Sequence, residues 1–578
     1  MTRIISFIIT LILPLSVWAQ ESREGSVDRN KDLPQIVREI SEQISRTTPE
    51  GKKGVVVWLI DNASVLKSSG QGKILSDLIV QNFSNKETLY HALYVLGDPT
   101  QGLVPPTKEI DRITMAFDVL LKEAPDNRIK NCLLGVRIAG KGASGFRGSR
   151  SVVLVTSSNG DNEDQLEETL RFLQKLRVRF FSIAGEAVYS DPYWKSVLAG
   201  VSSYSSESEK FRRLKFDLAG QESAYIEFPY GWPLMSTDPS YTVPSGFGYY
   251  ALSRLAVGTG GTYYVYNSGS SSGTFCQTNA CLLCGGQHQQ CGAHFQSTKL
   301  NMTAPDLRAR DLVRRDYGRQ PVAIAQHRAW VTLQKKGVLR GASQLKLSGK
   351  RFREVRSQMG SSSSLISGGG SWKARKGQVL RQIKEVKAVL AQFLPVLEKF
   401  GPDADLRVRA TADAFHLHLK MLLFNLKQFV YFCEEMDRVT RAKALPRKEF
   451  GGAKLDQYIG KRISGYSYRS LYLCHGGAPY RGMTFLGGDL VGEEQRELLD
   501  LADQLIDRHR STPWEVLVRR SAFALFTPII QAGTNKQKKR PKPESSGSGD
   551  EATATPNPDR PPRPGAGGSG SGGTATGD

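Results

Sequence analysis

The chain has 578 residues, enough for a few domains of about 100–200 residues each. Its formal net charge is +22, and residues 301–400 hold 21 Lys and Arg against 6 Asp and Glu, so most of the excess falls in that segment. The sequence has no HExxH, P-loop or strand-borne GxGxxG, so it lacks the commonest signatures of zinc peptidases and nucleotide-binding proteins.

The N-terminus has the pattern of an export signal. Arg3 precedes an apolar run from Ile4 to Leu15, and Val17 to Ala19 form a small-x-small exit. The run is too short for a spanning helix of about 20 residues, so residues 1–19 are predicted to be a signal peptide rather than an uncleaved anchor. No later stretch is apolar enough to cross a bilayer, and the mature protein is expected in the periplasm or outside the cell.

Residues 20–52 are predicted to be a polar leader with one helix, in "LPQIVREISEQI". Over 53–267, short apolar runs then alternate with amphipathic stretches, which is typical of crossover connections and a doubly wound, mainly parallel sheet covered by helices. The predicted strands are 55–60, 89–96, 151–156, 178–184 and 261–266. The predicted helices are "KILSDLIVQNF", "IDRITMAFDVLLKE" and "EDQLEETLRFLQKL".

The second half is predicted to be mainly helical. A Cys-rich loop (268–300) leads to a basic connecting segment (301–356), in which "DLRARDLVRRDY" predicts a helix and the rest is weakly periodic. A Ser/Gly linker (357–372) precedes an α-helical domain (373–530). Within it, helices are expected over about 374–400, 404–440, 492–509 and 512–525, the last with Thr512 as N-cap and Pro513 at its first position. Residues 534–578 are expected to be disordered.

Three segments of the first domain resemble the von Willebrand factor type A (vWA) family. They are "VVVWLIDNASV", "SVVLVTSSNGDNEDQLEETLRFLQKLRVRFFSIAG" and "SGFGYYALSRLAVGTGGTYYVY". In the last, "GTGGT" is interpreted as a helix C-cap before the final strand. The resemblance implies a protein-binding domain whose adhesion site holds Mg²⁺ through an Asp-x-Ser-x-Ser loop, a threonine and a later aspartate.

That metal site is predicted to be degenerate in this chain. Asp61 matches the family's first aspartate, but Ala63 and Val65 stand at the two serine positions and Ser157 stands at the later aspartate. Mg²⁺ requires about six oxygen ligands, so this loss of oxygens argues against a cation. Rescue would need Ser64 and Asp161 to join Asp61. The threonine has two candidates, Thr107 and Thr114.

A cysteine cluster follows the first domain. Two chemistries suit it in an exported protein: two disulfides, or a structural zinc held with His288 or His294, whereas a catalytic CxxC pair lacks a thioredoxin-like setting. Its members are Cys276, Cys281, Cys284 and Cys291.

The other cysteines and the paired histidines are expected to be structural. Cys433 and Cys474 are a candidate disulfide across the helical domain, and Cys132 is expected in the core. His416 and His418, two residues apart on a helix, point to nearly opposite sides and cannot chelate one ion, so solvated or core-edge positions are expected.

The sequence predicts an exported, non-enzymatic protein that binds a protein partner in the cell envelope through the vWA-like domain, without a cofactor. Two alternatives stay open: a Mg²⁺-dependent adhesion or assembly factor, and an envelope enzyme in the helical half. The basic residues of 301–400 suit an anionic envelope surface, and nucleic acid is the least expected partner because an exported chain rarely meets it.

Overall fold

The structure is a computed structural model. It describes residues 26–28, 31–48, 51–61, 70–97, 100–122, 131–156, 163–189, 222–224, 244–266, 302–338, 372–442, 467–472, 474–475, 478–479, 489–520 and 522–527. The predicted signal peptide, cysteine cluster and C-terminal tail lie outside these residues, and so does the Ser/Gly linker except for its last residue, Trp372.

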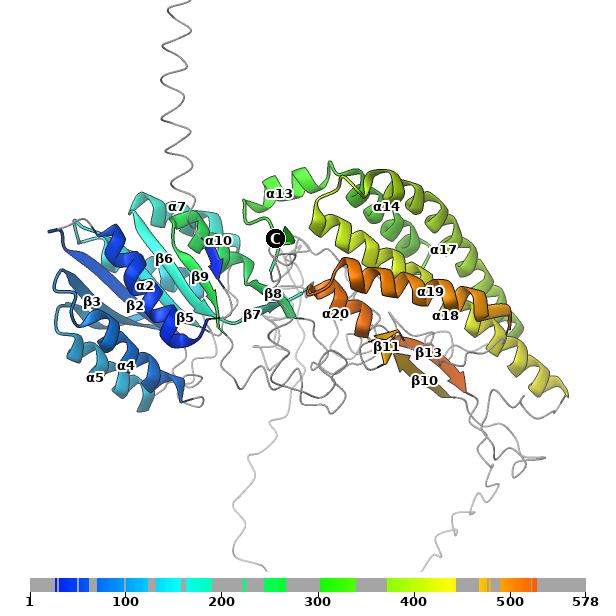
Figure 1. Cartoon of the computed structure of the whole chain (residues 1–578), viewed down its shortest axis with the longest axis horizontal. Coiled ribbons are helices and arrows are strands. Elements are labelled where there is room, and N and C mark those ends of the chain that lie inside the picture. The colour runs from blue at the N-terminus through cyan, green and yellow to red at the C-terminus, as the bar shows by residue number, and fades with distance from the viewer. Residues whose placement is uncertain are drawn as a thin grey trace, which may run out of the picture.

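A seven-stranded, mostly parallel sheet forms the first part of the molecule (Figure 1). Only the pair β3–β4 is antiparallel within it. The chain first forms the edge strand β1 and then crosses to β2. It continues outward through β3 to β4, crosses back to β5 and ends with β6 and β9, beside β1. The strands, in spatial order, are β1 (Ser26–Asp28), β9 (Thr262–Val265), β6 (Val178–Ala184), β5 (Arg150–Thr156), β2 (Gly54–Asp61), β3 (Leu89–Leu96) and β4 (Gln101–Thr107).

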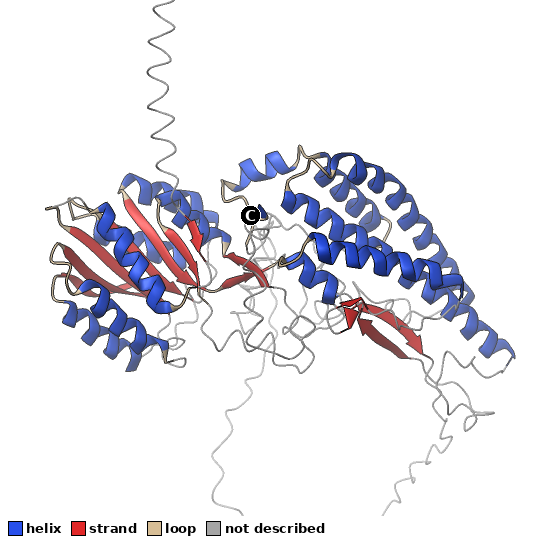
Figure 2. Ribbon diagram, viewed as in Figure 1, coloured by secondary structure: helices blue, strands red, loops and turns tan. Residues whose placement is uncertain are grey.

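The central strand β2 is buried on both sides, as its continuous apolar run predicts. Because side chains alternate along a strand, Val55 and Val57 pack into one helical layer while Val56 and Trp58 pack into the other. Figure 2 shows the sheet between its helices. The first layer holds α6 (Cys132–Ala143), α7 (Leu166–Lys175, after the short η1, Glu163–Gln165) and α10 (Tyr250–Thr259); the second holds α2 (Leu33–Thr47), α4 (Gln71–Phe83) and α5 (Ile110–Lys122).

The doubly wound sheet predicted for this region is confirmed, and so is the glycine C-cap. Helix α10 ends at Gly260, whose φ of 75° is favourable for glycine, and a Cβ at Gly261 would collide with the Phe180 carbonyl. The segment expected as a leader adds β1 and α2 to the sheet. Asp32 begins α2 with a capping box, accepting from the Gln35 amide at 2.8 Å.

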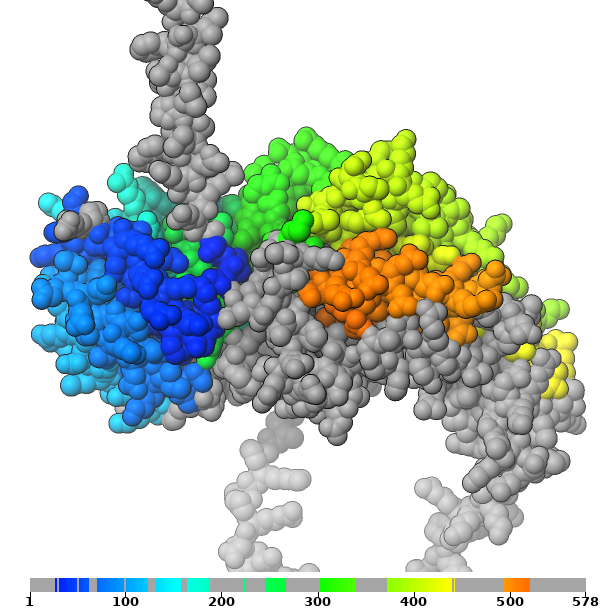
Figure 3. Space-filling model, in the orientation of Figure 1, coloured from blue at the N-terminus to red at the C-terminus, as the bar shows by residue number. Residues whose placement is uncertain are grey.

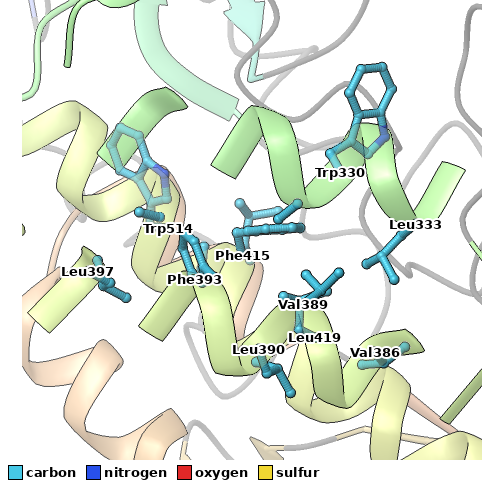
Figure 4. Close-up of a cluster of buried hydrophobic side chains, with 14 of the residues drawn as sticks. Trp330, Leu333, Val386, Val389, Leu390, Phe393, Leu397, Phe415, Leu419 and Trp514 are labelled. Atoms are coloured by element: carbon cyan, nitrogen blue, oxygen red, sulfur yellow. The ribbon is translucent and has the colours of Figure 1, made fainter. Parts of the chain in front are cut away.

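Long helices form the second part of the described chain. Their shared core, drawn in Figure 4, brings Val386 and Phe393 of one helix against Trp330 and Phe415 of two others. No helix in the described residues is both long and apolar enough for a membrane crossing. The helices are α13 (Arg310–Tyr317), α14 (Pro321–Lys335), α17 (Trp372–Phe400), α18 (Leu406–Ala442), α19 (Asp489–Arg508) and α20 (Pro513–Arg520).

Two predictions about secondary structure in this half are wrong. No helix was predicted in the weakly periodic sequence after α13, but it forms α14. Small residues such as Ala323 and Ala329 occupy buried positions there and weaken the apolar pattern. The helix expected over 512–525 stops at Arg520. Residues 522–527 instead form β13 (Ala522–Thr527), which pairs antiparallel with β10 (Ser467–Tyr472); the alternation in "AFALFT" has the strand period.

The proposed Cys433–Cys474 disulfide is also wrong. Cys433 is a free thiol buried in the helical core, where burial raises its pKa to about 12. Cys474 lies in β11 (Cys474–His475), which pairs with β12 (Ala478–Pro479). Cys132, as expected, is a core residue.

A two-stranded extension joins the sheet to the helices. Strand β7 (Glu186–Val188) follows β6 almost directly and pairs antiparallel with β8 (Pro244–Gly248), which leads into α10. Tyr189 and Phe247 of this extension are buried in the hydrophobic core of the helical part, not in that of the sheet. Figure 1 shows β7 and β8 between the two parts.

Candidate functional site

The sheet has one position where an open α/β fold usually places its binding site. The connection after β2 runs toward β3 on one side, and the connection after the adjacent strand β5 runs toward β6 on the other side. At such a switch point the loops after the two strands diverge and leave a crevice beyond their carboxyl ends. Asp61 is the last residue of β2 and Thr156 is the last residue of β5.

The register of the two strands brings Asp61 and Thr156 together. Ile60 is paired with Val155, so the next residue on each strand lies side by side at the edge. The Thr156 hydroxyl donates a hydrogen bond to Oδ2 of Asp61. Asp61 is 2 % exposed and Thr156 is 7 % exposed, so this contact is shielded from solvent.

Further polar residues lie around the same edge. The Tyr266 hydroxyl, directly after β9, is 2.8 Å from Oε1 of Gln71 at the start of α4. The Thr100 hydroxyl donates to the Gly97 carbonyl at 3.2 Å just after β3. These groups supply neutral hydrogen-bonding surface around the Asp61–Thr156 pair.

Neither candidate threonine joins Asp61, which corrects that part of the prediction. Thr107 is paired with His91 near the start of β3, whereas Asp61 is paired with Leu96 at its end. Five strand residues, about 17 Å, therefore separate the two positions. Thr114 lies in the first turns of α5, which starts close to the end of β4 at that opposite edge, and its hydroxyl donates to the Asp111 carbonyl.

The other predicted positions of the metal loop, Ala63, Ser64, Val65, Ser157 and Asp161, lie outside the described residues. Their chemistry still tests the fit of a cation, because the side chains at 63 and 65 carry no oxygen. Within the described ranges no three His, Cys, Asp or Glu side chains are grouped in a way that could hold a metal. These donors do not fit a vWA-type Mg²⁺ site.

Of the two histidines of α18, His418 is buried in the core and His416 is half-buried, at the core edge as expected. His418 is 3 % exposed, and burial lowers the pKa values of His416 and His418 to about 4, so both are neutral at pH 7. The cysteine cluster at 276–291 lies outside the described residues.

A charged contact that the sequence did not predict lies where the two parts of the molecule meet. Arg407 of α18 places its guanidinium 3.0 Å from Oε1 of Glu222 and 3.0 Å from the Thr303 carbonyl oxygen. Aromatic rings of Tyr189, Phe247 and Trp514 surround it at 5.4–5.9 Å. Nothing local in the sequence marks this contact, since Glu222 and Arg407 are 185 residues apart.

A second buried carboxylate, also not predicted, joins α18 to the end of α19. Oδ2 of Asp413 is 2.9 Å from Nε2 of His509 and 2.8 Å from Nη1 of Arg508, and Arg409 contacts the same carboxylate. Burial would raise the pKa of Asp413, but the hydrogen bonds from His509 and Arg508 outweigh it and hold the pKa below its ordinary value. This group ties helices together.

Replacing Thr156 by valine is expected to lower the free energy of unfolding by about 1–3 kcal/mol, because the buried Asp61 carboxylate would lose a hydroxyl donor. Urea unfolding checks this. Thr156→Ser, which keeps the hydroxyl, is the matched control and should retain most of the stability. Equal losses in the two variants would show that packing of the threonine methyl, not the hydrogen bond, is responsible.

Comparison with known proteins does not assign a family. No protein-family model matches the sequence, and no curated protein does. One similar solved structure is an aerotolerance-related membrane protein from Bacteroides fragilis with multiple mutations to serines, at 12 % identity over 39 % of this chain and 97 % of that chain, with a TM-score of 0.23. Another is a conserved hypothetical protein, BatB, from Bacteroides thetaiotaomicron, at 11 % identity over 42 % and 98 %, also with a TM-score of 0.23. Similarity at this level carries no functional conclusion.

Proposed function

We propose that this chain is an exported, non-enzymatic binding protein of the cell envelope, in which a vWA-like domain holds a protein partner at the carboxyl edge of its sheet without a cation. The doubly wound topology supports this location, because it places the loops after β2 and β5 at the switch point. The three sequence segments that resemble the vWA family support a protein as the partner, because domains of that family bind other proteins.

The Asp61–Thr156 contact is the single observation that carries the proposal. The one acidic residue retained from the family's metal loop is buried and accepts a hydrogen bond from the neighbouring strand. A carboxylate used in this way stabilises the end of the sheet. The carbon side chains at 63 and 65 remove the oxygens that a bridging cation would need. Recognition then depends on shape and on polar and apolar contacts at the edge.

A cation titration of the full chain tests the absence of a metal. Calorimetry with Mg²⁺ and Mn²⁺ is expected to show no binding tighter than millimolar. A variant that restores the family pattern, Ala63→Ser with Val65→Ser and Ser157→Asp, is the positive control for the scaffold and should gain binding. Sub-millimolar binding by the unmodified chain that Asp61→Asn abolishes would support the metal-dependent alternative instead.

A cross-linking experiment in envelope extract tests the binding edge. Lys73→Glu with Thr100→Arg changes the carboxyl edge, since Lys73 lies in the first turn of α4 and Thr100 follows β3. Lys52→Glu with Ser84→Arg makes the same charge change at the opposite edge. The unmodified protein should give one defined cross-linked band with its partner, and EDTA should not affect that band. The first pair of substitutions should abolish the band, and the second pair should leave it unchanged. Loss with both pairs, or with EDTA alone, contradicts the proposal.

A further inference from the structure

The outer face of α17 carries a row of four basic side chains, called here the basic face: Lys373, Arg381, Lys384 and Lys387. All four are exposed. They lie on one side of the helix, because positions 8, 11 and 14 residues after the first fall within about 80° of it at 100° per residue. In Figure 3 the yellow-green surface of α17 and α18 is open to solvent on its upper side.

The opposite side of α17 is fixed in the helical core, which determines which way the basic face points. Val379, Val386, Phe393 and Leu397 are buried there. Figure 4 shows Val386, Phe393 and Leu397 on the side that meets the neighbouring helices. The basic face is therefore held outward by packing and needs no rearrangement to meet a partner.

No acidic side chain neutralises the basic face in the part of the chain that the structure describes. Its four cations form none of the ion pairs found there, while neighbours on the flanks do. Glu385 pairs at 3.5 Å with Lys336, directly after α14, and Lys376 pairs with Glu434 of α18 at 2.6 Å. These ion pairs link α17 to the two adjacent helices and leave the ridge between them positive.

The positive charge continues onto α18. Lys427 has a pKa lowered first by burial and then by the charges of Lys387 and Lys420. Lys427 and Lys420 contact Glu494 and Glu497 of α19, so that side of the surface is partly neutralised. The least compensated charge is on α17 itself.

An apolar residue lies within the row. Leu380 is 46 % exposed and lies between Lys373 and Lys387 on the same side of α17. From residue 373 to residue 387 the helix rises about 21 Å, so the row is straight and long enough to contact several lipid headgroups at once. A helix face with lysines beside an exposed leucine is suited to a bilayer surface, where cations meet headgroup phosphates and an apolar side chain enters the acyl boundary.

We propose that the basic face binds anionic phospholipid headgroups, with α17 lying along the bilayer surface and Leu380 inserted between headgroups. The basic face is separate from the carboxyl edge of the sheet, so its binding does not depend on the function proposed for that edge. Lipid binding at the basic face assigns a role to four of the basic residues in 301–400. It leaves the sheet domain free to bind a protein partner.

Vesicle flotation tests this proposal, with protein lacking residues 1–19, which keeps every described residue. The probes are phosphatidylcholine vesicles with and without phosphatidylglycerol. Binding is expected only with phosphatidylglycerol and should weaken steeply with salt. Replacing all four residues of the basic face by glutamine should reduce affinity roughly 100-fold, because each basic residue near an anionic surface contributes substantially. Leu380→Ser should reduce it a few-fold at any salt concentration.

The matched control replaces four exposed lysines of the sheet domain by glutamine: Lys52, Lys53, Lys141 and Lys175. This variant has the same net charge and should bind vesicles like the unmodified protein. Three results would each overturn the proposal. They are an equal loss of vesicle affinity in both variants, binding to vesicles without phosphatidylglycerol, and binding to duplex DNA that depends on the basic face and is tighter than binding to vesicles. Circular dichroism checks that the substituted proteins remain folded. The vesicle result does not depend on the cation titration or the cross-linking at the sheet edge, so failure of either of those tests would not change it.

Discussion

Substitution of Arg407 by methionine is expected to lower the free energy of unfolding by about 3–5 kcal/mol, because it leaves the buried Glu222 carboxylate without its cation. The side chains of Arg407 and Glu222 are 5 % and 0 % exposed, so solvent cannot replace the lost partner. Methionine keeps most of the apolar stem among the surrounding rings, which limits the cavity. Urea unfolding followed by tryptophan fluorescence measures the change, since Trp514 is one of those rings.

A double-mutant cycle separates the ion pair from packing. Glu222→Gln removes the charge at the other end, and the variant carrying both substitutions should be more stable than Arg407→Met alone, with a coupling of about 0.5–3 kcal/mol. If Arg407→Met changes stability by less than about 0.5 kcal/mol, as a surface substitution would, then the contact between the two parts of the molecule is not held by this pair.

Asp413→Asn is expected to cost about 3 kcal/mol at pH 7, because a neutral amide is a weaker acceptor than a carboxylate for the hydrogen bonds with His509 and Arg508. The folded-state pKa of Asp413 lies below its ordinary value of 3.8. Its stabilisation is therefore complete above the unfolded-state pKa and is lost as the pH falls through the folded-state pKa. The difference between the two proteins should shrink below about pH 4.

Asp403→Asn is the matched control for this measurement, because Asp403 is exposed in the turn before α18. It should change stability by no more than about 0.5 kcal/mol at any pH. A stability difference for Asp413→Asn that stays constant from pH 7 to pH 3 would mean that the carboxylate charge does not contribute, and that only the shape of the side chain matters there.

The sheet was predictable from the sequence because its strands carry continuous apolar runs. All six residues from Val55 to Ile60 are buried, because the strand is covered on both faces. A helix that covers a sheet has one apolar side only, so six consecutive apolar residues favour a strand. The three long helices were predictable for the corresponding reason, since each has one apolar side. Asp61 could be placed at the end of its strand because the strand itself was evident.

Contacts between distant segments were not predictable. Helix α14 was missed because alanines fill some of its buried positions, and β13 was missed because its partner residues in β10 lie 50 to 60 residues earlier. The contact between Thr156 and Asp61 could have been predicted, since Thr156 ends the strand next to β2 in any doubly wound order. It was overlooked because the following residue, Ser157, was aligned with the family's later aspartate. Glu222 and Arg407 carry no local signal of their pairing.

The extension made by β7 and β8 bears on how the protein can be divided. Tyr189 and Phe247 belong by sequence to the sheet domain, yet they complete the hydrophobic core of the helices. A fragment ending near residue 267 would expose both aromatic rings to water, and the remaining helices would lack two of their largest core side chains. Recombinant fragments cut at that point would be prone to aggregation, and the smallest unit suitable for isolated expression includes α20.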